Sequence, residues 1–246
     1  MRPVLHRSSP GRDPQTATPP RAPASRARRL LRAALTGVAT GVALIVIALL
    51  VREQWPPLVQ LDERAVTDGV AIAAQHPDLL RALILWQWAF LAIHLLIPVA
   101  AIGLAYWWRT GNATRTWWAL STILTAWGLS NLLKEVVRRA RPVLDQPVES
   151  AAGYSFPSGH AANTAAMTTA LVVLVWPSLR SRAMRVTAVA SAAVLTVATA
   201  VDRVMLGVHY PSDVVAGILF GVGFVLASYL AYKHWPTPLP EPGTAS

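Results

Sequence analysis

The chain has 246 residues, which is enough for one compact domain and too few for several. Apolar residues make up 54% of it and charged residues 14%, whereas soluble domains contain about 25% charged residues. This composition excludes a disordered chain and argues against a soluble globule. The absence of cysteine excludes a disulfide framework, cysteine-based zinc sites and thiol catalysis.

The net charge of +10 could indicate nucleic-acid binding, so the position of the charge matters. Residues 1–32 contain eight Arg and one Asp, are rich in Pro and show no apolar periodicity. We expect this segment to be a disordered cytoplasmic tail that contacts anionic lipids at the cytoplasmic face. Because no folded basic module follows it, we expect no nucleic-acid partner.

Six apolar runs follow the tail, each close to the length of about 20 residues that a helix needs to cross a bilayer. They cover residues 33–51, 86–108, 116–133, 161–176, 186–201 and 214–232. The fourth and fifth runs are short and rich in Ala and Thr, which suits inner helices in close contact. The sequence therefore predicts an all-α bundle of six transmembrane helices over 33–232, with a short cytoplasmic tail at 233–246.

The distribution of Lys and Arg predicts the orientation of this bundle. With the N-terminus in the cytoplasm, the inner segments hold 14 of these residues and the outer segments hold eight, as the positive-inside rule requires. Both termini are then cytoplasmic, and we expect a location in the plasma membrane. Five of the eight outer residues nevertheless lie within 134–141 and at 203. Basic residues placed against the rule indicate a function at the outer face.

The third span ends in a basic stretch that suits an anion site. On a helix, Lys134 and Arg141 are seven residues apart and share a face. Arg138 lies near the same stripe, whereas Arg139 points elsewhere. Pro142 is expected to end the helix.

The next two helix starts carry the histidines. Pro157 can open a helix whose first turn contains Ser158 and Gly159, and free N–H groups there bind phosphate well. His160 follows directly. His94, in the middle of the second span, is instead expected to make a helix–helix hydrogen bond.

Pro211 suits the start of the last helix, with His209 just before it and Asp213 inside it. Asp213 could then fix the tautomer of His209, as a carboxylate does in a catalytic triad. By the predicted topology, all of these helix ends lie on the outer side of the membrane.

At these positions the sequence resembles the type-2 phosphatidic acid phosphatase superfamily. Its three motifs are matched by Lys134 through Arg141-Pro142, by Pro157-Ser158-Gly159-His160, and by Arg203, His209 and Asp213 at the right spacing. The motifs span 134–213, and the six-helix plan extends the resemblance to 33–232. The one departure is Asp202, where the family usually has Ser; an acid beside Arg203 is expected to reduce phosphate affinity.

The resemblance implies phosphoryl transfer without a metal or another cofactor. His209 would be the nucleophile that forms a phosphohistidine, Asp213 would orient it, and His160 would protonate the leaving oxygen. The remaining site residues would hold the phosphate oxygens: Lys134, Arg141, Ser158, the Gly159 amide and Arg203.

The expected substrate is a membrane lipid that meets the site on the extracytoplasmic side: phosphatidic acid, phosphatidylglycerol phosphate or a polyprenyl diphosphate. Arg138 could contact a second phosphate, which favours the diphosphate. A lipid phosphotransferase would use the same residues and stays open as an alternative. A non-catalytic protein that binds anionic lipid would not need His160, His209 and Asp213, and a vanadate haloperoxidase is normally soluble. Homo-oligomerisation is left open.

Overall fold

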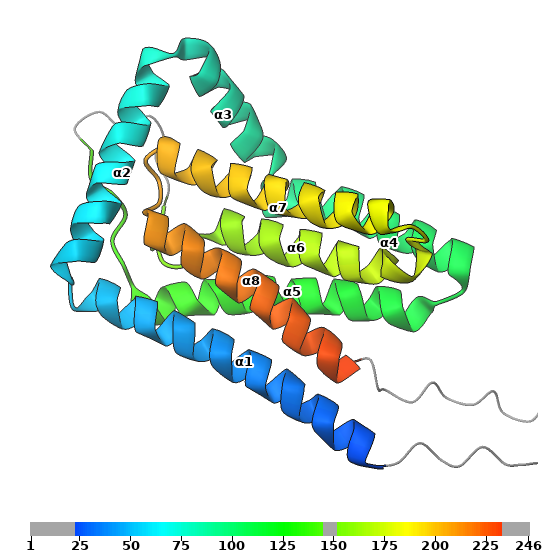
Figure 1. The fold of residues 1–246 in the computed structure, drawn as a ribbon. Helices are drawn as coiled ribbons and strands as arrows, with labels where there is room; N and C mark the ends of the chain where they lie inside the picture. Colours follow the sequence, from blue (N-terminus) through cyan, green and yellow to red (C-terminus); the bar gives the residue numbers. More distant parts are fainter. Residues whose placement is uncertain (1–22, 145–151, 233–246) are drawn as a thin grey trace, which may run out of the picture.

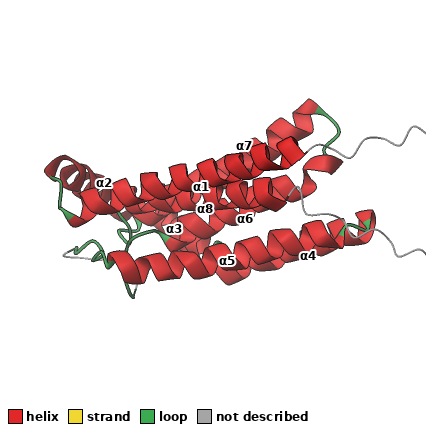
Figure 2. Cartoon of the chain, turned by 90° about the horizontal axis from the view of Figure 1, so that it is seen from below, coloured by secondary structure: helices red, strands yellow, loops and turns green. Residues whose placement is uncertain are grey.

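The computed structural model describes residues 23–144 and 152–232 (Figure 1). These residues form helices and loops and contain no strand, so the all-α prediction is confirmed. The long helices lie along one another as a bundle, and Figure 2 shows the same arrangement from below. The α-helices are α1 (Pro23–Arg52), α2 (Pro56–Gln75), α3 (Pro77–Ala89), α4 (Ala92–Thr110), α5 (Ala113–Val137), α6 (Gly159–Val175), α7 (Arg182–Met205) and α8 (Pro211–Tyr232).

Helix α6 lies at the centre of the bundle, and ten of its 17 residues are buried. The main apolar core joins it to α4, α5 and α8. Helix α1 packs along α8 and exposes Leu35, Val38 and Val42 on its other face, as a helix in contact with lipid does. Helix α2 lies across one end of the bundle, and α3 turns back from it toward α7 (Figure 1).

Five helices are long and apolar enough to cross a membrane: α1, α4, α6 with the turn after it, α7 and α8. Helix α5 has 25 residues and runs beside them, but its Thr, Ser and Asn content lowers its hydropathy. The predicted count of six spans is therefore approximate, although all six long helices lie in the bundle.

The predicted span 86–108 is not continuous, because the helix breaks between Ala89 and Ala92. Leu91 has an extended backbone, with ψ of 141°, and starts a new helix in a new direction. The His94 ring makes a 2.6 Å hydrogen bond to the carbonyl of Trp88, so it joins α3 to α4 across the break. The expected helix–helix bond of His94 is therefore found, but between consecutive helices.

Helix α1 begins at Pro23, so residues 23–32 are helical and the expectation of a disordered segment over all of 1–32 was wrong there. The helix formed by the apolar run continues without a break into this basic flank. Residues 1–22 and the predicted C-terminal tail at 233–246 lie outside the described residues.

Helix α6 is held at both ends. At its start, α8 approaches so closely that a Cβ on Gly217 would lie 2.7 Å from the carbonyl oxygen of Ser158. At its end, Arg115 of α5 donates to the carbonyls of Val173 and Leu174. Because the last carbonyls of a helix lack partners within it, this guanidinium caps α6.

Candidate active site

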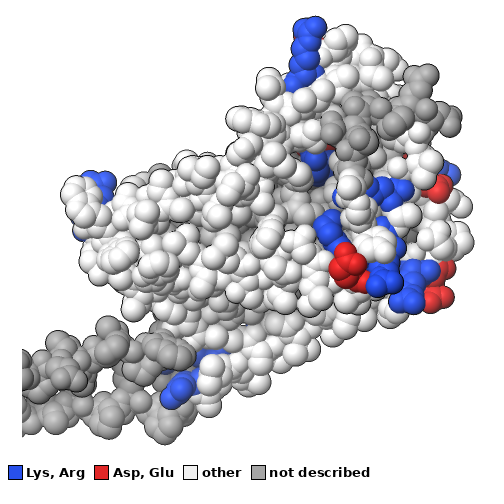
Figure 3. Space-filling model, turned by 180° about the vertical axis from the view of Figure 1, so that it is seen from behind, with Lys and Arg blue, Asp and Glu red and all other residues white. Residues whose placement is uncertain are grey.

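Four helix ends meet at the end of the bundle that α2 crosses: the C-termini of α5 and α7 and the N-termini of α6 and α8 (Figure 1). Figure 3 shows that basic and acidic side chains gather at this end, whereas the flanks of the bundle carry almost none. His160 lies within electrostatic range of Lys134, Arg203 and His209. The predicted motifs therefore come together in space.

A tight turn between α7 and α8 holds His209. The N–H groups of Val208 and His209 both donate to the carbonyl of Arg203, at 3.2 and 3.3 Å. Gly207 has a φ of 72°, and a Cβ there would lie 2.5 Å from the Leu144 side chain. Only glycine suits both the left-handed backbone and this contact. Helix α8 then begins at Pro211, as predicted.

Hydrogen bonds define the tautomer of His209. Ser155 donates its hydroxyl to the carboxylate of Asp213, and its Oγ lies 3.4 Å from His209 Nδ1. The hydroxyl therefore accepts from Nδ1–H. On the other side of the ring, Arg141 Nη1 lies 3.2 Å from Nε2, which can only accept from a guanidinium. Nε2 thus carries the lone pair.

Asp213 does not bond His209 directly, because its Oδ2 is 3.6 Å from Nδ1. The expected carboxylate–imidazole pair is completed by the hydroxyl of Ser155 between the two groups. Asp213 Oδ2 also accepts from the N–H of Tyr210 at 3.0 Å, as an acidic residue in the first turn of a helix often does.

Burial makes His209 neutral. The residue is 3% exposed, and loss of hydration lowers its pKa to about 4, helped by the positive charges of Arg141 and Lys134 and opposed by Asp213. A neutral ring with an unprotonated Nε2 is able to act as a nucleophile at neutral pH.

Lys134 and Arg141 reach the site by a different route from the one predicted. Helix α5 ends at Val137, so the two residues do not share a helix face. Lys134 Nζ donates to the carbonyl of Tyr154 at 2.9 Å, and its Cε would lie 3.7 Å from a Cβ on Gly159. The loop after α5 brings the Arg141 guanidinium back to the carbonyl of Val208 at 2.8 Å, beside His209.

The structure reverses the expected roles of Arg138 and Arg139. Arg138 ends α5 in a left-handed conformation, is exposed, and donates to the carbonyl of Glu135. Arg138 was expected to share a helix face with Lys134 and Arg141 and so to contact a second phosphate. That face does not form, because the helix ends at Val137, well before Pro142. The side chain of Arg139 is only 9% exposed and ion-pairs with Asp62 and Asp213 at 2.7 and 2.6 Å.

The start of α6 presents polar atoms without protein partners. Among the described residues, the buried Ser158 Oγ and His160 Nε2 have no hydrogen-bond partner. The Ser158 N–H donates to the carbonyl of Asp213 at 3.0 Å, so the helix amides left for an anion begin with Gly159. The His160 ring also has a hydrogen-bonding contact with the backbone of Gln87, which the break after α3 brings near.

Arg203 is 3% exposed. Its guanidinium ion-pairs with the carboxylate of Asp202: Nε donates to Oδ2 at 2.8 Å, and Nη2 donates to the same oxygen. The second carboxylate oxygen, Oδ1, is buried without a partner among the described residues. Asp202, the residue that departs from the family pattern, therefore ion-pairs with Arg203, the residue that the pattern assigns to phosphate binding.

Sequence reasoning did not identify Ser155, Asp62 or the ion pairs of Arg139. One signal was available for Asp62. It lies on the buried face of α2 with Val66, Gly69 and Ala73, at helical spacing, and an acidic residue in such a stripe needs a partner. Nothing in the sequence distinguishes Ser155 from other loop serines.

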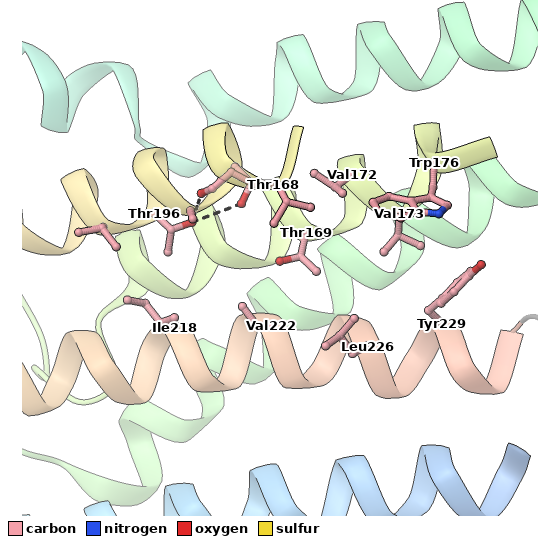
Figure 4. A pocket seen from close by; sticks show the side chains of 14 residues that line it. Thr168, Thr169, Val172, Val173, Trp176, Thr196, Ile218, Val222, Leu226 and Tyr229 are labelled. Atoms are coloured by element: carbon pink, nitrogen blue, oxygen red, sulfur yellow. Dashed lines mark hydrogen bonds between the residues drawn. The ribbon is translucent and has the colours of Figure 1, made fainter. Parts of the chain in front are cut away.

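An apolar cavity of about 670 Å³ lies between α6, α7 and α8 (Figure 4). Its walls include Val172, Ile218 and Leu226, and the hydroxyls of Thr168 and Thr196 bond each other at 3.4 Å. The cavity reaches toward the far end of these helices, away from His209.

Comparison with known proteins agrees with this geometry. The PAP2 superfamily profile matches residues 115–236. The chain is 36% identical over 123 residues to lipid A 1-phosphatase of Rhizobium etli, which covers 46% of this chain and 49% of that protein. It is 37% identical over 110 residues to decaprenylphosphoryl-5-phosphoribose phosphatase of Mycobacterium tuberculosis, covering 42% and 54%. The matches thus span about half the length of these relatives.

The fold also has a solved counterpart. A crystal structure of a transmembrane PAP2-type phosphatidylglycerolphosphate phosphatase from Bacillus subtilis superposes with a TM-score of 0.69 at 23% identity, covering 78% of this chain and 94% of that one. With the membrane-spanning helices described above, these matches establish a multi-span membrane protein. Residues 115–236 of this chain therefore form a domain of the PAP2 superfamily.

Proposed function

We propose that the protein is an integral membrane phosphatase that hydrolyses a phosphate from a lipid phosphate or diphosphate. The observation that carries the proposal is the geometry of His209. Its Nε2 lone pair lies beside the Arg141 guanidinium in a cluster of cations, while Nδ1–H is held by Ser155 and, through it, by Asp213. A site that only bound anions would not need a neutral, oriented imidazole.

In the first step, His209 Nε2 attacks phosphorus and the bond from phosphorus to the lipid oxygen breaks. His160 donates a proton to the departing oxygen, and its buried Nε2, without a protein partner, suits this role. The phosphohistidine is an imidazolium whose proton stays on Nδ1 and is donated in a hydrogen bond to Ser155. Ser155 and, behind it, the Asp213 carboxylate stabilise the added positive charge.

In the second step, water attacks the phosphohistidine and the N–P bond breaks. The now neutral His160 takes a proton from the water, which restores both histidines and releases inorganic phosphate. Phosphoryl transfer requires mainly positioning and charge stabilisation. Lys134, Arg141, Arg203 and the α6 amides from Gly159 onward would supply these without a metal or other cofactor.

We further propose that the site works at the outer face of the plasma membrane, because with this orientation the sequence segments assigned to the cytoplasm hold 14 Lys and Arg and the outer segments hold eight. A lipid phosphate reaches that depth from the outer leaflet. The preference for a diphosphate rested on Arg138, which is exposed and bonded to its own helix end, so the substrate class stays lipid phosphate in general.

The experiment is phosphate release from a lipid panel by the purified full chain in detergent with EDTA. The panel contains phosphatidic acid, phosphatidylglycerol phosphate and a polyprenyl diphosphate, and His209→Ala serves as the inactive control. Metal-free phosphate release that is lost in the control supports the proposal. Transfer of the phosphate to a second lipid would instead identify a phosphotransferase, and binding without turnover a lipid-binding protein.

A further inference from the structure

Arg139 joins two buried carboxylates that lie far apart in the sequence. Its Nη2 is 2.7 Å from Oδ2 of Asp62 and its Nη1 is 2.6 Å from Oδ1 of Asp213. Both acidic side chains are at most 1% exposed. The guanidinium also lies 4.0 Å from the ring centroid of Tyr210, which fixes its plane.

Asp62 makes further bonds to the start of α8. Its Oδ1 accepts from the N–H of Ser212 at 3.0 Å, and its Oδ2 accepts from the Ser212 hydroxyl. Arg139 Nη1 also donates to that hydroxyl, at 2.7 Å. Helix α2, which crosses the end of the bundle, thus contacts Ser212, the residue before Asp213, through both oxygens of the Asp62 carboxylate.

We propose that Asp62 and Arg139 are positioning residues that act on His209 through Asp213. This inference rests on the proposed role of His209 as the nucleophile. Arg139 holds Oδ1 of Asp213, so that Oδ2 is aimed at Ser155, which in turn receives Nδ1–H of His209. Asp62 fixes Arg139 and the first turn of α8 from the outside.

Charge balance gives the pair a second role. The two carboxylates and one guanidinium carry a net charge of −1 behind His209. Asp213 faces the ring from α8, while Arg141, Lys134 and His160 face it from the loop after α5, from α5 and from α6. Because Arg141 and Lys134 oppose protonation of His209 with their positive charge, the net charge of the network behind the ring tunes how readily His209 takes a proton.

The alternative is that the ion pairs only fasten α2 to the bundle. Two isosteric changes separate the two cases. Asp62→Asn removes a negative charge and should shift the pKa of His209 down, whereas Arg139→Gln removes a positive charge and should shift it up. We expect roughly 0.5–1 pH unit each way, less than the 1–3 units of a directly adjacent charge. A purely structural anchor gives no shifts of opposite sign.

The double variant Asp62→Asn/Arg139→Gln restores the net charge but not the hydrogen bonds. Its His209 pKa should return close to that of the wild type, while kcat stays low. Arg138→Gln is the matched control, because this neighbouring arginine is exposed and bonds only its own helix end. It should behave as the wild type does.

The readouts are kcat, KM and the pH dependence of kcat/KM on phosphatidic acid, together with exchange of the His209 Cε1 hydrogen measured by mass spectrometry. We expect each single variant to lose about 10–100-fold in kcat with KM within about twofold. Loss of melting temperature alone, with an unchanged pH profile and kcat, would overturn the inference.

The histidine exchange does not need turnover, so it keeps the two proposals apart. If the wild-type protein shows no phosphatase activity but the two variants still shift the His209 pKa in opposite directions, the phosphatase proposal is refuted and the positioning role of Asp62 and Arg139 is kept. If the wild type is active but the variants show no such shifts, the positioning role is refuted and the phosphatase proposal is kept. If a single variant does not fold, the charge-balanced double variant is measured instead, and a wild-type kcat in it overturns the inference.

Discussion

Replacing Asp202 by Ser should strengthen phosphate binding, because it removes a carboxylate that competes for Arg203. In the free protein, Asp202 Oδ2 accepts from both Nε and Nη2 of this arginine, and the two side chains are 2% and 3% exposed. A bound phosphate must share or displace these bonds. Serine at this position keeps a small polar side chain without the negative charge.

The magnitude follows from the bonds involved. A hydrogen bond to a charged group is worth about 1.5–3 kcal/mol net, and 1.4 kcal/mol is about a tenfold change in affinity. Release of Arg203 from one such bond should therefore lower the inhibition constant of inorganic phosphate, and the KM for lipid phosphate, on the order of tenfold. The same substitution should lower the stability of the protein without phosphate, because removing one partner of a buried ion pair is destabilising.

The assay measures competitive inhibition by inorganic phosphate and the melting temperature with and without phosphate. Asp202→Ser should melt earlier than the wild type when phosphate is absent and recover most of the difference when it is saturating. Asp68→Ser, at an exposed position of α2, is the control and should change neither quantity. Unchanged or weaker phosphate inhibition in Asp202→Ser would refute the idea that this carboxylate competes with the ligand.

Three further predictions follow from the site and the topology. A cysteine at Asp78, beside α2, should react with an impermeant thiol reagent in intact cells, and one at Ser181 before α7 should not; the opposite pattern would invert the orientation. His209→Ala should abolish the trapped phosphoenzyme, whereas His160→Ala should slow an alkyl phosphate much more than p-nitrophenyl phosphate, since a good leaving group needs less proton donation; equal losses would argue against His160 as the acid. Vanadate, which resembles the five-coordinate transition state, should inhibit strongly while EDTA does not, and activity lost to chelation and restored by Mg²⁺ would contradict the metal-free mechanism.

Local sequence signals placed the start of the last helix correctly and other helix boundaries less well. Pro211 begins α8, because proline is compatible with a first turn and cannot serve an interior one. Helix α6 begins at Gly159, two residues after Pro157, so Ser158 is its N-cap and does not lie in the first turn as predicted. The end of α5 was misplaced because Pro142 marks only the last position a helix could reach. The helix stops earlier, at Val137, and that shift exchanged the roles of Arg138 and Arg139.

Long-range contacts explain the rest of what the sequence did not reveal. The break after Ala89 occurs inside a continuous apolar run, where no proline or glycine announces it. Asp62 joins the site through Arg139 and Ser212, 77 and 150 positions further on, and Ser155 through His209 and Asp213, 54 and 58 positions further on. A motif gives the groups that touch the ligand, whereas the groups that orient them depend on tertiary packing.

The length and fixed ends of α6 relate the site to the thickness of the membrane. With the turn after it, the span from Gly159 to Ser178 has 20 residues, close to the roughly 30 Å of a typical hydrocarbon layer. Arg115 caps the C-terminal end of the helix, and close contact with α8 fixes the N-terminal end. The amides after Ser158 lie at the end of this span, so under the proposed function a bilayer that matches the span brings the lipid phosphate to their level. We therefore expect the turnover rate to fall in membranes of longer-chain lipids, whose hydrocarbon layer exceeds the span.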